Sequence, residues 1–284
     1  MAEYPNKVWL NGEILDAESA RISVFDRGFL FGDGIYEVMA RIRGRFFYEE
    51  AHLKRLDECL QKIKIDFDTR MLTKEIPRLL KASDIVENDC LLYIQVSRGV
   101  APRTHAFPHD IPPTVMMYVT PKTLPDINSI NASVLTMEEF RWSRCDIKTT
   151  SLLGNVMANE IAVQRECYEM LFVRNDIVTE ASHCNMFFVK DNIVYTHPAN
   201  EYILDGITRQ VVLGLCADLD IVVREEGVSK QRIPQMDEAF LTGTSTQIAS
   251  IKQIDQHFYY KGDEIGKVTK KLQNAFLGLK KTGF

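Results

Sequence analysis

Lys148 lies in the stretch RWSRCDIKTTSLLGN, residues 141–155, where an apolar, strand-like segment gives way to threonines and then to a small-residue helix start. A lysine at the end of a strand can reach solvent, or it can be an amine held in a pocket for covalent chemistry. An amine of the second kind needs partners that hold and tune the group with which it reacts. Three polar segments and one loop elsewhere in the chain contain candidates for that role.

Two turns have the composition of an anion-binding site. DGITRQVVLGL, residues 205–215, places a glycine before a helix start with Thr208 in its first turn, and FLTGTSTQ, residues 240–247, runs from a strand into hydroxyl side chains. Backbone N–H groups at a helix N-terminus favour an anion. Ordinary helix caps use the same residues, so either turn alone is more typical of a cap. If they converge with Arg55 of an amphipathic helix, the turns form a phosphate site.

A carboxylate and a loop complete the set of candidates. Glu180, in VTEASHCN, follows the strand MLFVRNDIVT, and it is either a solvated glutamate or a carboxylate for a cationic ring nitrogen. The loop RGVAPRTHAFP, residues 98–108, carries Arg98, Arg103 and His105. Side chains two residues apart in an extended chain point to the same side, which suits a carboxylate clamp. A surface loop with unrelated charges is the simpler interpretation of the loop alone.

The elements that would position these side chains indicate a two-domain α+β or α/β chain. Hairpins are expected at Asn11-Gly12 and Asp191-Asn192, and Gly44 suggests another tight turn. Strands are expected at 90–99, 114–120, 131–139, 169–174 and 220–225, and helices at about 49–65, 70–82, 152–166, 207–217 and 264–279. Pro77 must kink or begin the second helix. The domains are predicted as 1–120 and 129–284, joined by a proline-containing linker, 121–128.

The composition limits the classes of protein to consider. The 284 residues suit two domains, and 45% hydrophobic with 26% charged residues is typical of a soluble globular protein. A net charge of −5 without a basic run argues against nucleic-acid binding, and no apolar run is long enough to span a bilayer. No signal peptide is expected. Six scattered cysteines, with no CxxC and no metal-ligand spacing to histidine, indicate a reduced, cytoplasmic protein without a metal site.

Six motifs in order carry a family resemblance: FDRGFLFGDGIYE, RGVAPRTHAFP, RCDIK, VTEASHCN, DGITR and LTGT. In this order and spacing, the chain resembles the fold-type IV pyridoxal-phosphate enzymes, and within them the D-amino acid aminotransferases, from about residue 6 to the C-terminal helix. The resemblance implies a small N-terminal α/β domain and a larger C-terminal cofactor-binding domain. It also implies pyridoxal 5'-phosphate as cofactor and ping-pong transamination between a D-amino acid, such as D-alanine, and a 2-oxo acid.

The resemblance assigns roles toward the cofactor residue by residue. Lys148 would form the Schiff base with the cofactor, and Glu180 would contact its pyridine nitrogen. Leu204 would pack beneath the ring. The residues implied for the cofactor phosphate are Arg55, Ile207, Thr208 and Thr244.

The resemblance also implies a trap for the substrate α-carboxylate, made by Tyr36, Arg103 and His105. Arg103 and His105 would reach in from the partner subunit, so that a homodimer would share its active sites. His52 stands at a matching position before Arg55, but no role follows for it.

The chain also departs from the family pattern. After Glu180 the family usually has small or hydroxylated residues, where this chain has His183 and Cys184, and Gly243 resembles the branched-chain aminotransferases rather than the D-amino acid enzymes. These departures bear on substrate range and cofactor retention. The alternatives are a branched-chain L-amino acid transaminase, an (R)-amine transaminase, an aminodeoxychorismate lyase and a non-catalytic metabolite-binding protein. Lys148 and Glu180 together disfavour the last of these.

Overall fold

The computed structural model describes residues 4–262 and 264–282, which form two compact units. The first unit contains Met1–Thr123 and Ile147–Ser151, and the second contains Leu124–Asp146 and Leu152–Phe284. None of the described helices is long and apolar enough to cross a membrane.

The chain changes unit within the predicted linker, but a second segment departs from the predicted division. Residues 147–151 belong to the first unit instead of the domain predicted at 129–284. They do so because Ile147 is buried in the first unit's core and Thr149 forms a β-bridge with Ile35. The carbonyl of Lys148 also accepts a hydrogen bond from the backbone N–H of Tyr36 at 3.0 Å.

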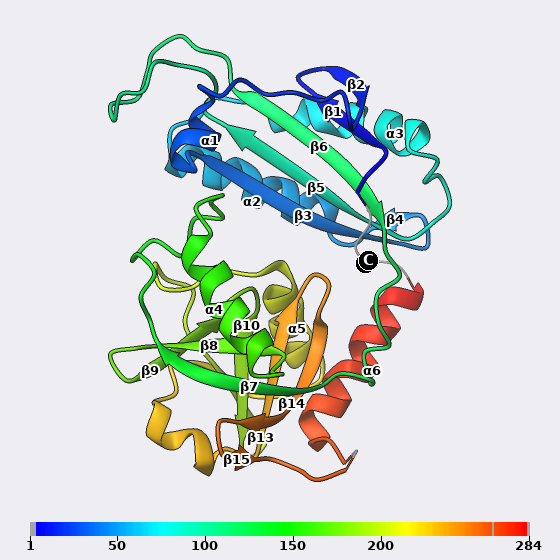
Figure 1. Cartoon of the computed structure of the whole chain (residues 1–284). Helices are drawn as coiled ribbons and strands as arrows, with labels where there is room; N and C mark the ends of the chain where they lie inside the picture. Colours follow the sequence, from blue (N-terminus) through cyan, green and yellow to red (C-terminus); the bar gives the residue numbers. More distant parts are fainter. Residues whose placement is uncertain (1–3, 263, 283–284) are drawn as a thin grey trace. The chain divides into compact units, whose positions relative to one another are not determined.

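The first unit is built on a six-stranded antiparallel sheet (Figure 1). Its strands lie in the order β2-β1-β6-β5-β3-β4, with bounds β1 Lys7–Leu10, β2 Glu13–Asp16, β3 Gly34–Ile42, β4 Arg45–Phe46, β5 Cys90–Ser97 and β6 Thr114–Pro121. Its helices are α1 Arg27–Phe31, α2 Glu49–Lys62, η1 Thr69–Met71 and α3 Leu72–Ala82. Apolar side chains of α2 and α3 pack on the sheet to form the core of this unit.

Local sequence explains the turns and helices of the first unit. Asn11 and Gly12 have φ of 49° and 100°, and Gly44 has φ of 81°, which are the positive values that tight hairpin turns require. The β1–β2 and β3–β4 hairpins are therefore confirmed. Leu56 and Leu60, one helical turn apart on α2, are both buried in the core. Pro77 lies inside α3 and does not begin it.

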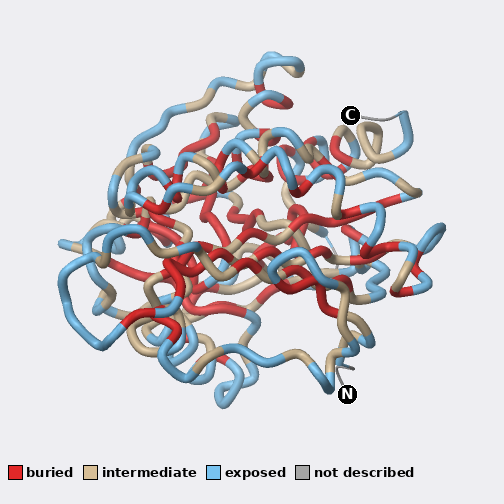
Figure 2. The backbone as a smooth tube through the Cα atoms, turned by 90° about the horizontal axis from the view of Figure 1, so that it is seen from above, coloured by how far each residue is buried: buried red, intermediate tan, exposed pale blue. Residues whose placement is uncertain are grey.

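The second unit contains a nine-stranded sheet with the order β12-β11-β10-β13-β14-β7-β8-β9, and β15 pairs with β14. The strands are β7 Asn131–Glu138, β8 Glu169–Arg174, β9 Ile177–Ala181, β10 Asn185–Lys190, β11 Ile193–Thr196, β12 Val223–Glu225, β13 Glu238–Gly243, β14 Gln247–Ile254 and β15 His257–Phe258. An additional pairing of β9 with β10, at Glu180 and Asn185, closes six of the strands into a ring. Buried side chains from these strands form the core of this unit, and Figure 2 marks the buried residues of the chain in red.

Helices α4 Leu153–Gln164, α5 Ile207–Asp218 and α6 Lys267–Thr282, with the short η2 Lys230–Gln235, complete the second unit. Helix α4 lies close to β8 because Ala158 and Ala162, one turn apart, pack against Met170 and Phe172. From α6, the fully buried Gln273 donates hydrogen bonds to the carbonyls of strand β14 and of the segment before β7.

Two expectations about the segments next to the candidate residues were wrong. Residues 141–147 form turns and bends, not a strand, because Arg141 turns its side chain inward to form ion pairs. Glu180 does not follow a single long strand. Instead, Asn175 and Asp176, both with positive φ, turn the chain back so that Glu180 lies within β9.

Candidate active site

Lys148 presents an amine to an aromatic face. Its Nζ atom lies 4.3 Å from the centre of the Tyr36 ring, a distance typical of a cation–π contact. The backbone N–H of Lys148 approaches Sγ of Cys59 at 3.5 Å, which helps to hold the segment against α2. Among the described residues, the amine has no hydrogen-bond or ion-pair partner. The half-buried amine thus lies against an aromatic ring.

A buried carboxylate lies beside this lysine and holds Arg55. The Nε and NH2 groups of Arg55 donate to the two oxygens of Glu37 at 2.9 and 2.7 Å, and Nδ1 of His52 lies 2.9 Å from Glu37. Burial alone would raise the pKa of Glu37, but the charges of Arg55, His52 and Lys148 outweigh it and hold that pKa well below its ordinary value. Burial lowers the pKa of His52. Glu37 therefore fixes the orientation of the Arg55 guanidinium.

Sequence reasoning missed Glu37 and the position of His52. The available signal was a charged side chain on the buried face of β3, where Ile35 and Met39 flank Glu37 at a spacing of two. A buried carboxylate at such a position needs charged or hydrogen-bonding partners, which are here Arg55 and His52.

The loop after β5 is anchored by buried ion pairs. Arg98 forms a two-bond ion pair with Asp33, at 2.8 and 2.9 Å, and Arg27 donates to the same carboxylate at 2.7 Å. Arg27 also donates to the carbonyl of Thr104 at 2.6 Å. Burial would raise the pKa of Asp33, but the two arginines lower it overall. Arg98 thus holds the loop in place and is not free to clamp a substrate.

Arg103 and His105 are exposed, and both lie near the ring of Phe31. The guanidinium of Arg103 lies 5.0 Å from the centre of the Phe31 ring, and the His105 ring lies 5.8 Å from it. The two side chains therefore gather on one side of the loop, as their spacing suggests. No contact joins either of them to Tyr36 among the residues that the structure describes.

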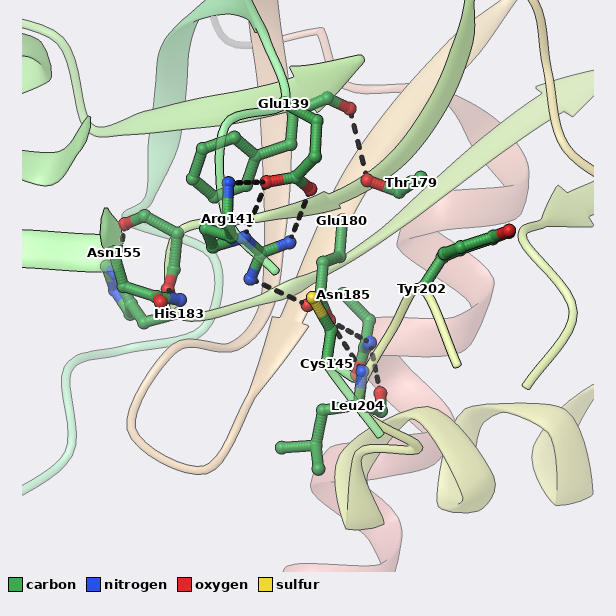
Figure 3. Close-up of polar contacts among 12 residues, drawn as sticks. Glu139, Arg141, Cys145, Asn155, Thr179, Glu180, His183, Asn185, Tyr202 and Leu204 are labelled. Atoms are coloured by element: carbon green, nitrogen blue, oxygen red, sulfur yellow. Dashed lines mark hydrogen bonds and ion pairs between the residues drawn. The ribbon is translucent and has the colours of Figure 1, made fainter. Parts of the chain in front are cut away.

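In the second unit, Glu180 is the centre of a buried hydrogen-bond network (Figure 3). One oxygen accepts from NH1 of Arg141 at 3.0 Å, and the other accepts from the backbone N–H of Leu204 at 2.9 Å and from Nδ2 of Asn185 at 3.4 Å. Arg141 also makes two hydrogen bonds of 2.8 Å to Glu139, so it lies between two carboxylates. The network fixes the carboxylate of Glu180, and the interpretation of this residue as a solvated loop glutamate was wrong.

Burial raises the pKa of Glu180 to about 7, against the lowering effect of Arg141 and of the Leu204 N–H. Glu139, the second buried carboxylate beside Arg141, adds to the increase. A carboxyl group that titrates near neutrality gains most from a cationic partner, because that partner stabilises the charged form. Sequence reasoning missed the roles of Arg141, Glu139 and Asn185, although Arg141 and Asn185 lie within quoted segments and Glu139 lies two residues before one.

The segment before α5 is held close to this network. Asn185 donates to the carbonyl of Leu204 at 2.7 Å, and a Cβ atom on Gly206 would collide with Oδ1 of Asn185. A glycine is therefore required at the helix start for space. Ile207 and Thr208 form the buried first turn of α5, which begins without a side-chain cap and leaves N–H groups for an anion.

Thr244 lies in the turn between β13 and β14, whose ends pair at Gly243 and Gln247. Helix α5 packs against β13, but no polar contact joins Thr208 to Thr244 among the described residues. The structure thus brings together Lys148 with Tyr36 in one unit, and Glu180 with Leu204 in the other.

Comparisons with known proteins agree with these observations. Residues 34–254 match the family described as amino-transferase class IV. The chain is 38% identical to a D-alanine aminotransferase of Staphylococcus haemolyticus, over 95% of this chain and 96% of the relative.

Solved structures of branched-chain aminotransferases share the fold. The enzyme from Thermoproteus uzoniensis matches with a TM-score of 0.85 and 24% identity, covering 96% of this chain and 94% of that one. The enzyme from Escherichia coli matches with a TM-score of 0.86 and 22% identity, covering 97% and 94%. The expected fold-type IV architecture is therefore confirmed, and the chain belongs to the class IV aminotransferase family.

Proposed function

We propose that this protein transfers the amino group of a D-amino acid, such as D-alanine, to a 2-oxo acid, with pyridoxal 5'-phosphate as its cofactor. The identity of 35–38% with D-alanine aminotransferases from staphylococci and Bacillus licheniformis, over nearly the full length of both chains, supports the substrate class. The observation that carries the proposal is the amine of Lys148, which is held over the Tyr36 ring; the motif resemblance assigns the reactive-lysine role to this residue.

The chemistry of the donor groups fits this cofactor. Lys148 would hold it covalently, and Glu180 would accept a hydrogen bond from the protonated ring nitrogen, because its carboxylate is buried and fixed by three donors. Leu204 would contact the ring. The phosphate would be bound by Arg55, whose guanidinium Glu37 orients, together with the first turn of α5 at Ile207 and Thr208 and the hydroxyl of Thr244.

When bound, the cofactor supplies an electron sink for the bond that breaks at the substrate Cα. The chain's own residues then bind, orient and move protons. The amine of Lys148 would take the proton from the substrate Cα as a general base, and it would then give up that proton as a general acid. Glu180 would keep the ring nitrogen protonated, and the charge of that nitrogen would in turn favour the ionised form of Glu180.

The substrate α-carboxylate would be bound by Tyr36, Arg103 and His105, with Arg103 and His105 supplied by the partner subunit of a homodimer. Helix α4 supports an assembly, because it exposes a group of large apolar side chains: Leu153, Val156, Met157 and Val163. We further propose a cytoplasmic location, because all six cysteines are free.

A substrate panel tests the proposed activity. Purified protein that has been loaded with pyridoxal 5'-phosphate is assayed with D-alanine, L-leucine, (R)-phenylethylamine and aminodeoxychorismate. The proposal requires the highest kcat/KM with D-alanine and a 2-oxo acid acceptor. Preference for L-leucine would assign the protein to the branched-chain enzymes, preference for the amine to the (R)-amine transaminases, and release of pyruvate from aminodeoxychorismate to the lyases.

A further inference from the structure

A cluster of three different metal-ligating side chains lies in the bend between β9 and β10. Glu169, His183 and Cys184 each offer one ligand atom, and these atoms lie within 4.8 Å of one another. The proposed transaminase reaction uses none of the three. We propose that this cluster binds one zinc ion per chain.

The local backbone explains how two adjacent residues contribute to one site. Neighbouring side chains on a strand point to opposite faces. Residues 182–184 form a bend between two strands, so His183 and Cys184 can direct their ligand atoms to the same side. The third ligand, Glu169, begins β8 and lies 14 residues earlier in the chain. This separation explains why no metal-ligand spacing is visible in the sequence.

The carboxylate of Glu169 is fully buried and has a prepared orientation. Its Oε1 atom accepts hydrogen bonds from the backbone N–H of Met170 at 2.8 Å, and from the backbone N–H and the hydroxyl of Ser182 at 3.2 and 2.5 Å. Its Oε2 atom faces His183, with Nδ1 at 2.5 Å and the backbone N–H at 3.1 Å. One oxygen is thus fixed by the donors of Met170 and Ser182, while the other faces the proposed site.

Two neighbours lie against the sulfur atom of Cys184. A Cβ atom on Gly243 would lie 3.2 Å from Sγ of Cys184, so a serine at position 243 would crowd the thiol. On another side, the hydroxyl of Thr246 lies 3.3 Å from Sγ and 3.1 Å from the hydroxyl of Tyr168. The departures from the family pattern at Cys184 and Gly243 therefore belong to one local arrangement.

The ligand set points to zinc among the common metal ions. Thiolate, imidazole and carboxylate ligands suit a borderline-soft ion, and zinc takes them in a tetrahedral arrangement with bonds of about 2.0–2.3 Å. Three protein ligands leave a fourth position for water. The side chain of His183 is 49% exposed, so solvent and the ion can enter from that side. On binding, zinc would replace any protons on the ligand atoms, and those protons would leave to solvent.

The test measures bound metal in the cofactor-loaded enzyme. Wild type and variants of equal cofactor content are dialysed against micromolar Zn²⁺, and zinc per chain is measured by elemental analysis. Wild type is expected to bind one ion per chain, and Cys184→Ser and His183→Gln are each expected to bind at least 10-fold more weakly. Cys167→Ser and His257→Gln, the same substitutions at positions outside the cluster, should bind as wild type does.

Cobalt provides a second readout that identifies the sulfur ligand. Co²⁺ added to wild type is expected to produce a thiolate-to-metal absorption band that Cys167→Ser retains and Cys184→Ser loses. The proposal is overturned if wild type holds no more zinc than the Cys184→Ser/His183→Gln double variant, or if the outside variants lose zinc equally. In that event, the cluster is only a hydrogen-bonded pair of Glu169 and His183 that ties the bend to β8. Metal content is independent of turnover, so the result does not depend on the proposed transaminase activity.

Discussion

NH1 of Arg141 donates a 3.0 Å hydrogen bond to Glu180, while the remainder of the same guanidinium binds Glu139. One buried cation thus serves two buried carboxylates, and it packs over the Phe172 ring at 4.0 Å. The side chain that is proposed to face the cofactor depends on Arg141 for its charge and its orientation. Arg141 therefore acts as a positioning residue for Glu180.

Arg141→Met is expected to destabilise the protein strongly. The substitution leaves Glu180 buried without its cation and leaves Glu139 with only the more distant Arg174, at 3.8 Å, and breaking a buried ion pair in this way costs about 3–5 kcal/mol. Urea unfolding of wild type and variant measures the loss in the free energy of unfolding. Arg144→Met is the matched control, because its exposed pair with Asp146 should change the free energy by only about 0.5 kcal/mol. Equal losses in the two variants would contradict the role of Arg141.

Glu180→Gln is expected to lower turnover while the cofactor remains bound. The change keeps the shape of the side chain and removes the charge that holds the ring nitrogen protonated. Losing one such contact raises the barrier by about 2–4 kcal/mol, or roughly 30- to 1000-fold in kcat. Steady-state kinetics with D-alanine measure the effect, and Glu160→Gln on the exposed face of α4 is the control. An unchanged kcat would show that Glu180 does not face the ring nitrogen.

The pKa of Glu180 leads to a pH dependence of stability in the cofactor-free protein. Because its folded pKa, about 7, exceeds the ordinary value of 4.5, its contribution is complete below pH 4.5 and is lost as the pH rises through 7. The free energy of unfolding of wild type should fall by about 3 kcal/mol relative to Glu180→Gln across this window. Glu37, whose pKa is lowered, changes its contribution only below pH 4.5. A difference between the two proteins that is independent of pH would contradict the raised pKa.

The sequence predicted most elements whose signal is local. The Asn-Gly turn at position 11 needs positive φ, and the leucines of α2 recur at helical spacing, so both elements follow from neighbouring residues. Glu180 was predicted to follow one strand, MLFVRNDIVT, although the polar residues 174–176 interrupt its apolar residues. The turn at Asn175 and Asp176 was the signal that this reading overlooked.

The candidate site was less predictable, because its contacts join distant residues. The lysine at 148 and the glutamate at 180 were identified through motifs, but their surroundings depend on packing. Glu37 meets Arg55 across 18 residues, and Arg141 meets Glu180 across 39. No pattern of spacing indicates such pairs, and only a charge on a buried strand face hints at one of them.

Arg103→Ala tests the carboxylate clamp. If Arg103 binds the α-carboxylate, its loss should lower kcat/KM for D-alanine by the equivalent of about 2–5 kcal/mol, because the carboxylate is left without its charged partner. The kcat/KM for (R)-phenylethylamine, which has no carboxylate, should change little. Arg43→Ala, at the exposed β3–β4 turn, is the control. Equal losses for both substrates would show that the loop has only a structural role.

Mixing subunits tests whether the clamp comes from the partner. Lys148→Ala and Arg103→Ala proteins are each expected to have low activity with D-alanine. After subunit exchange, a mixed dimer would contain one site with both wild-type residues, so activity should recover in part. If exchange is demonstrated and no activity returns, Arg103 does not serve the partner's site.

The proposed function requires that Lys148 carries the cofactor. The direct measurement is borohydride reduction of the cofactor-loaded protein, followed by proteolysis and mass spectrometry of the peptides. The added mass of the reduced cofactor is expected on the peptide that contains Lys148, and no such mass is expected anywhere in the Lys148→Ala protein. Attachment at a different lysine, or an unlabelled Lys148 peptide in a protein that turns over D-alanine, would contradict it.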